Sequence, residues 1–189
     1  MKHLLIFDCF GVLCSEIAPV WFARHFEAEE ARRLKVLYFS GADRGDTDLD
    51  TLIAQLSQGL GFSQDQIRQE WADIFTLNLP LVEYIRSLRN THHLALLSNA
   101  PKGLVEQIFD HYRLYELFDQ VFISSHYAMA KPDRAFYLLC TAAFAGQYDR
   151  AFMIDDNQAN LCGLEELGIT PIHFTANASF FDTMKEVLT

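Results

Sequence analysis

The sequence is poor in cysteine and has no long apolar run. Its four cysteines, at positions 9, 14, 140 and 162, show no CxxC spacing and do not form the ladder typical of a secreted disulfide scaffold. We therefore expect reduced thiols and a cytoplasmic location. No apolar run approaches the length of a membrane span, and no basic segment followed by an apolar one opens the chain.

Positive charge is also scarce. The 189 residues include 15 Lys and Arg against 25 Asp and Glu, which gives a formal net charge of -10. This balance argues against binding to nucleic acid or to an anionic membrane surface. It does not exclude an anionic substrate, because a bound divalent cation can reverse the sign of the potential locally. Hydrophobic residues make up 50% of the chain, enough for a globular core with a small insert.

One stretch near the start, residues 3–14, organises the rest of the chain. Residues 4–7 are apolar, Asp8 follows them directly, and Gly11 comes three residues later. A short apolar run bounded by glycine is typical of a buried strand in an α/β sheet. Asp8 would then lie at the carboxyl edge of that sheet, where α/β proteins bind ligands. On this stretch alone, a helix cap or a turn is an equally good interpretation of Asp8.

The next part of the chain has a helical pattern. From residue 17 to residue 79, apolar side chains recur at intervals of three and four residues, and no strand pattern interrupts them. This pattern predicts an all-helical domain over residues 15–79, inserted into a core made of residues 1–14 and 80–189.

The tripeptide Arg44-Gly45-Asp46 falls inside this helical region. An adhesion motif has no other support in a chain that we expect to be cytoplasmic. We interpret the tripeptide as a turn before the third helix of the region.

From residue 81 onward, helical and strand patterns alternate. Strands are predicted at residues 93–97, 120–124, 151–154 and 171–174. Helices are predicted at residues 81–88, 101–111, 134–144, 157–167 and 179–188. Repeated strand–helix units predict an α/β fold, a Rossmann-like parallel sheet covered on both faces and joined by right-handed crossovers.

Polar residues follow four of the predicted strands. They are Asp8, Ser98, Asn99, Lys131, Asp155 and Asp156. The carboxyl ends of parallel strands meet at one edge, so these groups can converge. Three carboxylates placed together repel one another unless a cation offsets them, and Mg²⁺ prefers such oxygen ligands. With Lys131 balancing charge and Ser98 holding an anionic oxygen, the set suits phosphoryl transfer, in which an aspartate can be the nucleophile.

The stretches that carry these residues read FDCFGVL, LLSNA, AKPD and MIDDNQAN. Their order and spacing resemble those of the haloacid dehalogenase-like (HAD) hydrolase superfamily, and they span the whole predicted core. The resemblance implies that Asp8 is the nucleophile, that Ser98 binds the transferring group and that Lys131 stabilises its charge. It also implies that the inserted helices form a small cap over the site.

The same resemblance implies a cofactor and a substrate class. Mg²⁺ would be held by Asp8, by the main-chain carbonyl of Phe10, and by Asp155 with Asp156. Asn99 and Phe10 would contact the substrate. The implied function is a Mg²⁺-dependent phosphatase that acts on a small phosphorylated metabolite through an aspartyl-phosphate. The resemblance leaves open which of Asp155 and Asp156 binds the metal directly, and it gives no oligomeric state.

The sequence departs from the phosphatase pattern at one position. Phosphatases of this group usually carry a second Asp two residues after the nucleophile as the general acid and base, and here that position is Phe10. Loss of such a group typically costs ~10²–10⁴-fold in rate. The proton could instead be moved by water, by the substrate or by a cap residue. Glu16 is a candidate for this role, although a solvated linker residue is the favoured interpretation.

Two other functions agree with the loss of this Asp. One is a dehalogenase or a phosphonate hydrolase, and the latter needs a cap lysine that forms a Schiff base. Lys35 is the one lysine in the insert, and we expect it to be a solvated helix residue. The acidic pair Asp155-Asp156 argues against a dehalogenase. The other is a binding or regulatory protein that keeps the fold without turnover.

Overall fold

The computed structural model describes residues 2–188, and its centre is a five-stranded parallel sheet. The strands are β1 (Lys2–Phe7), β2 (His93–Ser98), β3 (Gln120–Ile123), β4 (Tyr148–Asp155) and β5 (Ile169–His173). Their spatial order is β3-β2-β1-β4-β5, and every pairing is parallel. The predicted α/β, Rossmann-like sheet is confirmed.

Strand β1 lies at the centre because its residues can be buried on both faces. Leu4, Leu5, Ile6 and Phe7 have no exposed surface, as expected for a continuous apolar run in a covered parallel sheet. Phe7 pairs with β2 on one side and with β4 on the other. This register brings the residues that follow β1 and β4 to the same edge of the sheet.

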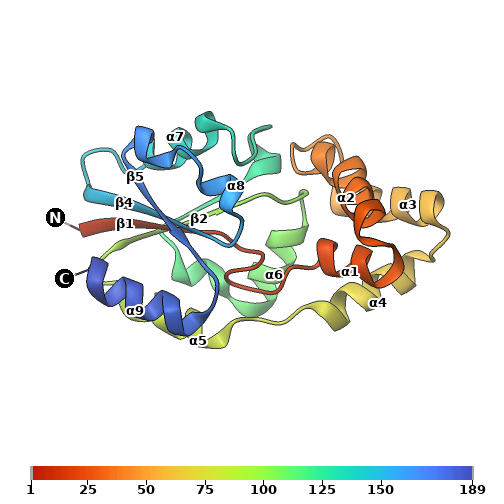
Figure 1. Ribbon diagram of the computed structural model, residues 1–189, viewed down its shortest axis with the longest axis horizontal. Coiled ribbons are helices and arrows are strands. Elements are labelled where there is room, and N and C mark those ends of the chain that lie inside the picture. Colours follow the sequence, from red (N-terminus) through yellow and green to blue (C-terminus); the bar gives the residue numbers. More distant parts are fainter. Residues whose placement is uncertain (1, 189) are drawn as a thin grey trace.

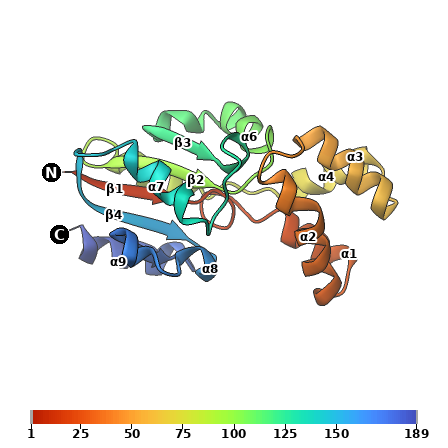
Figure 2. The ribbon, with the colours of Figure 1, turned by 90° about the horizontal axis from the view of Figure 1, so that it is seen from above.

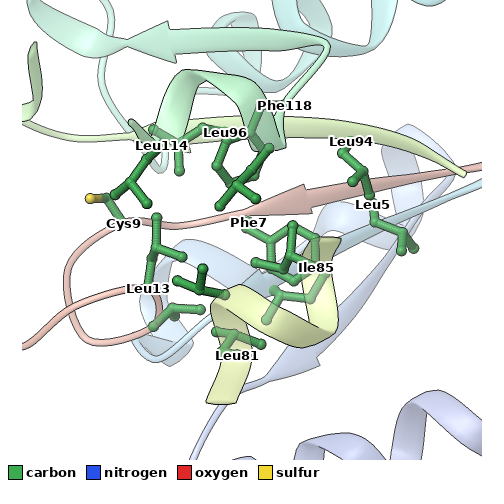
Figure 3. Packing of buried hydrophobic residues seen from close by; sticks show 14 of the residues in the cluster. Leu5, Phe7, Cys9, Leu13, Leu81, Ile85, Leu94, Leu96, Leu114 and Phe118 are labelled. Atoms are coloured by element: carbon green, nitrogen blue, oxygen red, sulfur yellow. The ribbon is translucent and has the colours of Figure 1, made fainter. Parts of the chain in front are cut away.

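Helices cover both faces of the sheet (Figure 1). One face carries α5 (Leu79–Leu88), α6 (Leu104–Tyr112) and α9 (Asn177–Val187), whose apolar side chains share a core with Leu5 and Phe7. Figure 3 shows part of this cluster, including the contribution of α5. The other face carries α7 (Arg134–Ala142) and α8 (Gln158–Leu161), packed on Leu4 and Ile6.

A group of four helices lies beyond the carboxyl ends of the strands (Figures 1 and 2). We call this group the helical insert. It comprises α1 (Ala18–His25), α2 (Ala28–Ala42), α3 (Leu49–Leu60) and α4 (Gln64–Ile74). Its core is separate from the sheet's and contains Trp21, Phe22, Phe39, Leu52 and Trp71. An insert with a core of its own can hold its shape without packing deeply on the sheet.

Helices α3 and α4 of the insert begin at residues suited to that position. The side chains of Asp48 and Ser63 accept hydrogen bonds from backbone N–H groups in the first turns of α3 and α4, at 2.9 and 3.1 Å. Gly61 ends α3 in the left-handed conformation with φ at 81°. Exact domain boundaries at residues 14/15 and 79/80 stay a prediction.

The turn predicted at Arg44-Gly45-Asp46 is confirmed, and it joins the insert to the core. Arg44 forms an ion pair with Asp133 at 2.8 Å. Gly45 has a φ of 90°, and a Cβ atom there would lie 2.4 Å from the carbonyl oxygen of Ser125. Only glycine allows this close approach between the two parts of the chain.

One predicted helix is wrong. Residues 157–167 form α8 and a separate 3₁₀ helix, η3 (Leu164–Leu167), rather than one continuous helix. The break falls at Gly163, whose φ of 75° lies in the left-handed region and cannot continue an α-helix. Helix α6 also begins three residues later than predicted, after Gly103 with φ at 97°.

Within residues 2–188, no helix combines the length and apolar character needed to cross a membrane.

The packing predicts which substitutions destabilise the fold. Phe109→Ala removes a fully buried ring from the core between α6 and the sheet. We expect it to lower the free energy of unfolding by about 3–5 kcal/mol, as measured by urea denaturation. The matched control is Leu37→Ala on α2, where the side chain is 59% exposed, with an expected change within about 0.5 kcal/mol. Similar losses in the two variants would contradict this packing.

Candidate active site

The site lies at the carboxyl edge of the sheet, between β1 and β4. Asp8 follows β1 directly, and its backbone N–H donates to the carbonyl of Ile154 at 2.9 Å. Asp155 is the last residue of β4. The chain passes from β1 to β2 on one side and reaches β4 on the other, so this is the point where the strand order reverses. Open α/β sheets bind ligands at such a point.

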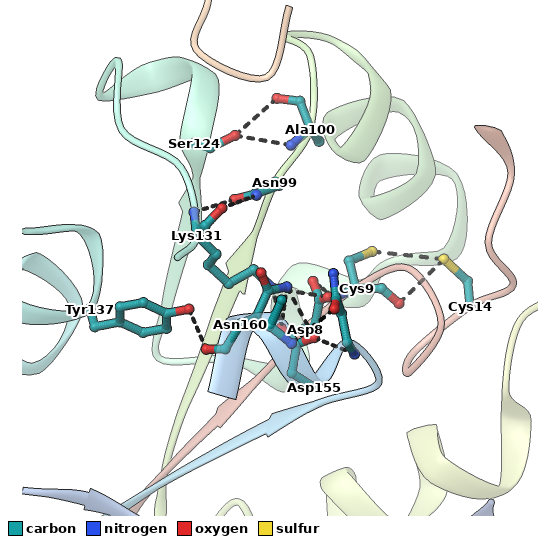
Figure 4. Close-up of polar contacts among 12 residues, drawn as sticks. Asp8, Cys9, Cys14, Asn99, Ala100, Ser124, Lys131, Tyr137, Asp155 and Asn160 are labelled. Carbon is teal, nitrogen blue, oxygen red and sulfur yellow. Dashed lines mark hydrogen bonds and ion pairs between the residues drawn. The ribbon is translucent and has the colours of Figure 1, made fainter. Parts of the chain in front are cut away.

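Lys131 connects the two aspartates. Its Nζ atom lies 2.9 Å from Oδ2 of Asp8 and 2.6 Å from Oδ2 of Asp155, and its side chain has no exposed surface (Figure 4). Burial alone would lower the pKa of Lys131, but the two carboxylates together raise it above its usual value. The side chain is therefore a fixed ammonium ion inside the site.

Burial also raises the pKa of Asp8 well above its usual value, and the charge of Asp155 adds to this effect. Two hydrogen-bond donors oppose it: Lys131 on one carboxylate oxygen, and the backbone N–H of Cys9 on the other, at 2.6 Å. The ionised form of Asp8 is therefore stabilised by positive charge close to it, such as that of Lys131.

Asn99 holds the backbone around Lys131. Its amide oxygen accepts from the N–H of Lys131 at 2.8 Å, and its amide nitrogen donates to the carbonyl of Lys131 at 2.9 Å. This pair of bonds fixes the loop from which the lysine reaches the two aspartates. The structure thus shows a positioning contact for Asn99, while its predicted contact with substrate stays a prediction.

The two adjacent aspartates have different surroundings. The carboxylate of Asp155 accepts from Lys131, from the N–H of Asn157 at 2.8 Å and from the side-chain amide of Asn160 at 3.1 Å. The carboxylate of Asp156 faces the cavity, and no side chain among the described residues donates to it. Asp156 is therefore the one with free oxygens for a ligand.

Gly11 makes room for Asp156. A Cβ atom at position 11 would lie 2.2 Å from Oδ2 of Asp156, and φ of Gly11 is 79°. Gly11 is thus required for two reasons. It allows the positive φ of the loop, and it leaves space for the carboxylate of Asp156.

A divalent cation fits this group of residues. Asp8, Asp155 and Asp156 each offer a carboxylate oxygen, and these three atoms lie within 4.8 Å of one another. When all three carboxyl groups are ionised, the one ammonium of Lys131 leaves two negative charges unbalanced. The carbonyl oxygen of Phe10 accepts no hydrogen bond from any described residue, so it is free to act as a further ligand. This oxygen-rich, doubly negative set matches the preference of Mg²⁺.

Ser98 differs from the other predicted site residues. It is fully buried at the end of β2, its Oγ atom has no hydrogen-bond partner among the described residues, and it does not line the cavity. A buried hydroxyl without a partner is unfavourable and often marks a functional position. Its predicted role in binding the transferring group stays a prediction.

A cavity of about 280 Å³ separates this edge of the sheet from the helical insert. From the core, Asp8, Phe10, Asn99, Lys131 and Asp156 line it. From the insert and the segment leading to it, the lining residues are Glu16, Ile17, Ala18, Lys35, Phe39, Asp43 and Trp71. The structure thus brings together the predicted site residues, with Asp155 and Ser98 behind the cavity wall.

Lys35, which we expected to be a solvated helix residue, is half-buried on α2 and lines the cavity. Asp43 and Asn160 are site residues that the sequence analysis missed. Asn160 lies one helical turn beyond the acidic pair, and this spacing could have identified it. No sequence pattern could have identified Asp43, since its position depends on how the insert meets the core.

Two carboxylates on the insert side are also perturbed. Burial raises the pKa of Asp43 to about 7, against the opposing charge of Lys35. Burial likewise raises the pKa of Glu16, again opposed by Lys35. The wall formed by the insert side therefore carries two carboxyl groups whose pKa values are raised by burial.

Comparisons with known proteins identify the family of the chain. The family model of the haloacid dehalogenase-like hydrolases matches residues 2–168, and the chain belongs to this family. The resemblance inferred from the four sequence stretches is thereby confirmed. No curated protein sequence matches the chain.

Solved structures show the same fold. A predicted HAD-like family hydrolase from Porphyromonas gingivalis superposes with a TM-score of 0.76 at 20% identity, covering 100% of this chain and 98% of that one. A HAD family enzyme from Bacteroides thetaiotaomicron, in complex with magnesium and inorganic phosphate, gives 0.73 at 21% identity, covering 94% and 96%. The L-2-haloacid dehalogenase of Xanthobacter autotrophicus, with chloropropionic acid covalently bound, gives 0.65 at 15%, covering 98% and 83%.

The raised pKa of Asp43 predicts a pH-dependent stability. Between about pH 4 and pH 7, the unfolded chain loses this proton while the folded chain keeps it, so stability falls as pH rises. Asp43→Asn removes this loss. We expect wild type to lose roughly 1–3 kcal/mol relative to the variant between about pH 4 and pH 8, measured by urea denaturation without metal. A constant difference across this range would contradict the assigned pKa.

Proposed function

We propose that the protein is a Mg²⁺-dependent phosphatase that acts on a small phosphorylated metabolite in the cytoplasm. One observation carries the proposal: three carboxylates and one lysine meet at the cavity with two negative charges unbalanced. A divalent cation supplies the missing charge and attracts a phosphate group to an otherwise acidic site. The magnesium and phosphate complex of the Bacteroides thetaiotaomicron enzyme, which has the same fold, supports this assignment.

In the proposed mechanism, Asp8 is the nucleophile. One of its carboxylate oxygens attacks phosphorus, the bond to the ester oxygen breaks, and an aspartyl-phosphate forms. Lys131 holds Asp8 in place and stabilises the charge on the phosphoryl oxygens. Asp8, Asp156 and the carbonyl of Phe10 would hold Mg²⁺, which would supply positive charge beside the reacting phosphoryl group.

Asp155 acts through its contacts. It accepts hydrogen bonds from Lys131 and Asn160 and so holds the lysine's ammonium group beside Asp8. Asp155 is therefore a positioning residue, and Asp156 takes the position of the direct metal ligand.

The helical insert would act as a cap that shapes the substrate. Its apolar side chains, Ile17, Phe39 and Trp71, and its charged ones, Glu16, Lys35 and Asp43, form one wall of the cavity. A volume of about 280 Å³ admits a small organic phosphate. The mixed lining favours a substrate whose alcohol portion has both apolar and polar surface.

A second candidate function, hydrolysis of a phosphonate through an imine on Lys35, is favoured by the position of Lys35 in the cavity. Phe10, in place of the usual second aspartate, agrees with it. Phosphatase action is preferred because Asp8, Asp155, Asp156 and Lys131 account for a metal-assisted phosphoryl transfer without a covalent role for Lys35.

The proposed function predicts metal-dependent turnover. We expect 4-nitrophenyl phosphate to be hydrolysed with Mg²⁺ and not with a chelator present. Asp8→Asn, which removes the nucleophile, should abolish turnover, and Asp156→Asn should weaken both turnover and the rise in Tm caused by Mg²⁺. Asp182→Asn on the exposed surface of α9 is the control and should match wild type. Release of halide from a haloacid without metal would favour a dehalogenase, and phosphate binding without any turnover a binding protein.

The phosphonate alternative has its own test. An imine on Lys35 would be trapped by borohydride in the presence of an aldehyde-bearing phosphonate. We expect no such trapping, and mass spectrometry should show an unmodified Lys35 peptide. The control is Lys102, a lysine of the core outside the cavity lining. Reduction confined to Lys35 would overturn phosphatase action as the main activity.

A further inference from the structure

We propose that Asp43 is the general acid and base of this site, so that the insert supplies the proton transfer that Phe10 cannot perform. The inference rests on the proposed phosphatase function and deepens it. It is carried by the position of Asp43 in the cavity and by the way the structure holds it there.

Because Phe10 stands at the usual position of the acid, the proton must come from another group near the leaving oxygen, and the insert side offers such groups. In phosphoryl transfer the attacking and leaving oxygens lie roughly in line through phosphorus. Asp8 attacks from the edge of the sheet, so the leaving oxygen points toward the opposite wall. The carboxylic acids on that wall are Glu16 and Asp43. Phe10 lines the cavity on the core side and carries no proton to give.

Asp43 is the better placed of these two acids. Besides the main cavity, it borders an adjoining hollow together with Asn99 and Lys131, so it faces the part of the core that holds the nucleophile. Within residues 2–188, no group donates a hydrogen bond to its carboxylate, so the carboxylate is available to a substrate or a water. Glu16 lines the main cavity but not the adjoining hollow.

The backbone of Asp43 is anchored at both ends. Its N–H donates to the carbonyl of Phe39 at 2.8 Å, which ends α2. Its carbonyl accepts a 2.5 Å hydrogen bond from Oγ of Ser124, a fully buried residue of the core that also accepts from the N–H of Ala100. The ion pair between Arg44 and Asp133 and the close approach of Gly45 to Ser125 fix the following turn. These contacts hold the backbone that carries the carboxyl group of Asp43 against the core.

The surroundings of Asp43 also suit a proton donor near neutral pH. The charged groups that act on it are Glu16, Lys35, Arg44 and Lys131. Burial outweighs the three cations, and the pKa of about 7 leaves a large protonated fraction at neutral pH. Asp43 also caps the C-terminus of α2, the negative end of the helix dipole, which further disfavours the ionised form.

The proton moves twice in the proposed reaction. As Asp8 bonds to phosphorus and the ester bond breaks, the proton on Asp43 moves to the leaving oxygen, and the alcohol departs neutral. Asp43, now a carboxylate, then takes a proton from water while that water attacks phosphorus. The bond between phosphorus and Asp8 breaks, phosphate leaves, and both aspartates return to their starting state.

Leaving-group dependence tests this role. Phenyl phosphate releases an alcohol with a pKa of about 10, similar to tyrosine, and needs protonation, whereas 4-nitrophenol is a much better leaving group. We expect Asp43→Asn to lower kcat/KM for phenyl phosphate by about 10²-fold or more and for 4-nitrophenyl phosphate by less than about tenfold. Asp43→Glu should recover part of the loss. Wild-type kcat/KM for phenyl phosphate should fall above about pH 7, and Asp43→Asn should lack this fall.

Matched variants separate the outcomes. Glu16→Gln should lower kcat/KM for both substrates by the same factor, and Glu29→Gln, on an exposed face of α2, should change neither. Equal losses for both substrates in Asp43→Asn, or a leaving-group split in Glu16→Gln, would overturn the role of Asp43 while Mg²⁺-dependent turnover leaves the phosphatase function intact. Absence of Mg²⁺-dependent turnover in wild type would overturn both.

Discussion

The ion pairs of Lys131 with Asp8 and Asp155 are the interaction on which the site depends. A carboxylate buried without a partner is strongly unfavourable, so β1 and β4 can end in aspartates side by side only with a cation between them. That cation comes from a distant part of the chain, and Asn99 holds its loop in place through two hydrogen bonds. The sheet order, the loop before α7 and the polarity of the site are thus parts of one arrangement.

The charges of these residues do not balance one another, and this imbalance bears on the function of the site. One lysine cannot balance three carboxylates, and Asp156, above Gly11, has oxygens that no other side chain among the described residues satisfies. If the site served only to stabilise the fold, each of these carboxylates would be paired with a group of opposite charge or replaced by an apolar side chain. In the proposed function, this surplus of two negative charges would draw a divalent cation and, through it, a phosphate into an acidic protein.

Much of this site could be predicted from the sequence because it follows strands. Asp8 and the Asp155-Asp156 pair come directly after apolar runs, and the edge of a parallel sheet brings such residues together whatever the loops do. Asp43 and Lys35 could not be placed in this way, since a helical pattern shows which face is apolar but not which residues meet another domain. The break at Gly163 was missed for a related reason: a glycine inside a helical pattern does not reveal its φ.

The replacement at Phe10 makes sense in the light of the insert. A general acid two residues after the nucleophile would lie on the core side, independent of the insert. With Phe10 there, the side chain packs against the apolar clusters of both core and insert. The proposed proton transfer from Asp43 then depends on two contacts that hold the insert against the core. Ser124 donates a hydrogen bond to the backbone of Asp43, and Arg44 forms an ion pair with Asp133. In the proposed reaction, the nucleophile therefore belongs to the core and the acid to the insert, and contact between these two parts brings both groups to the substrate.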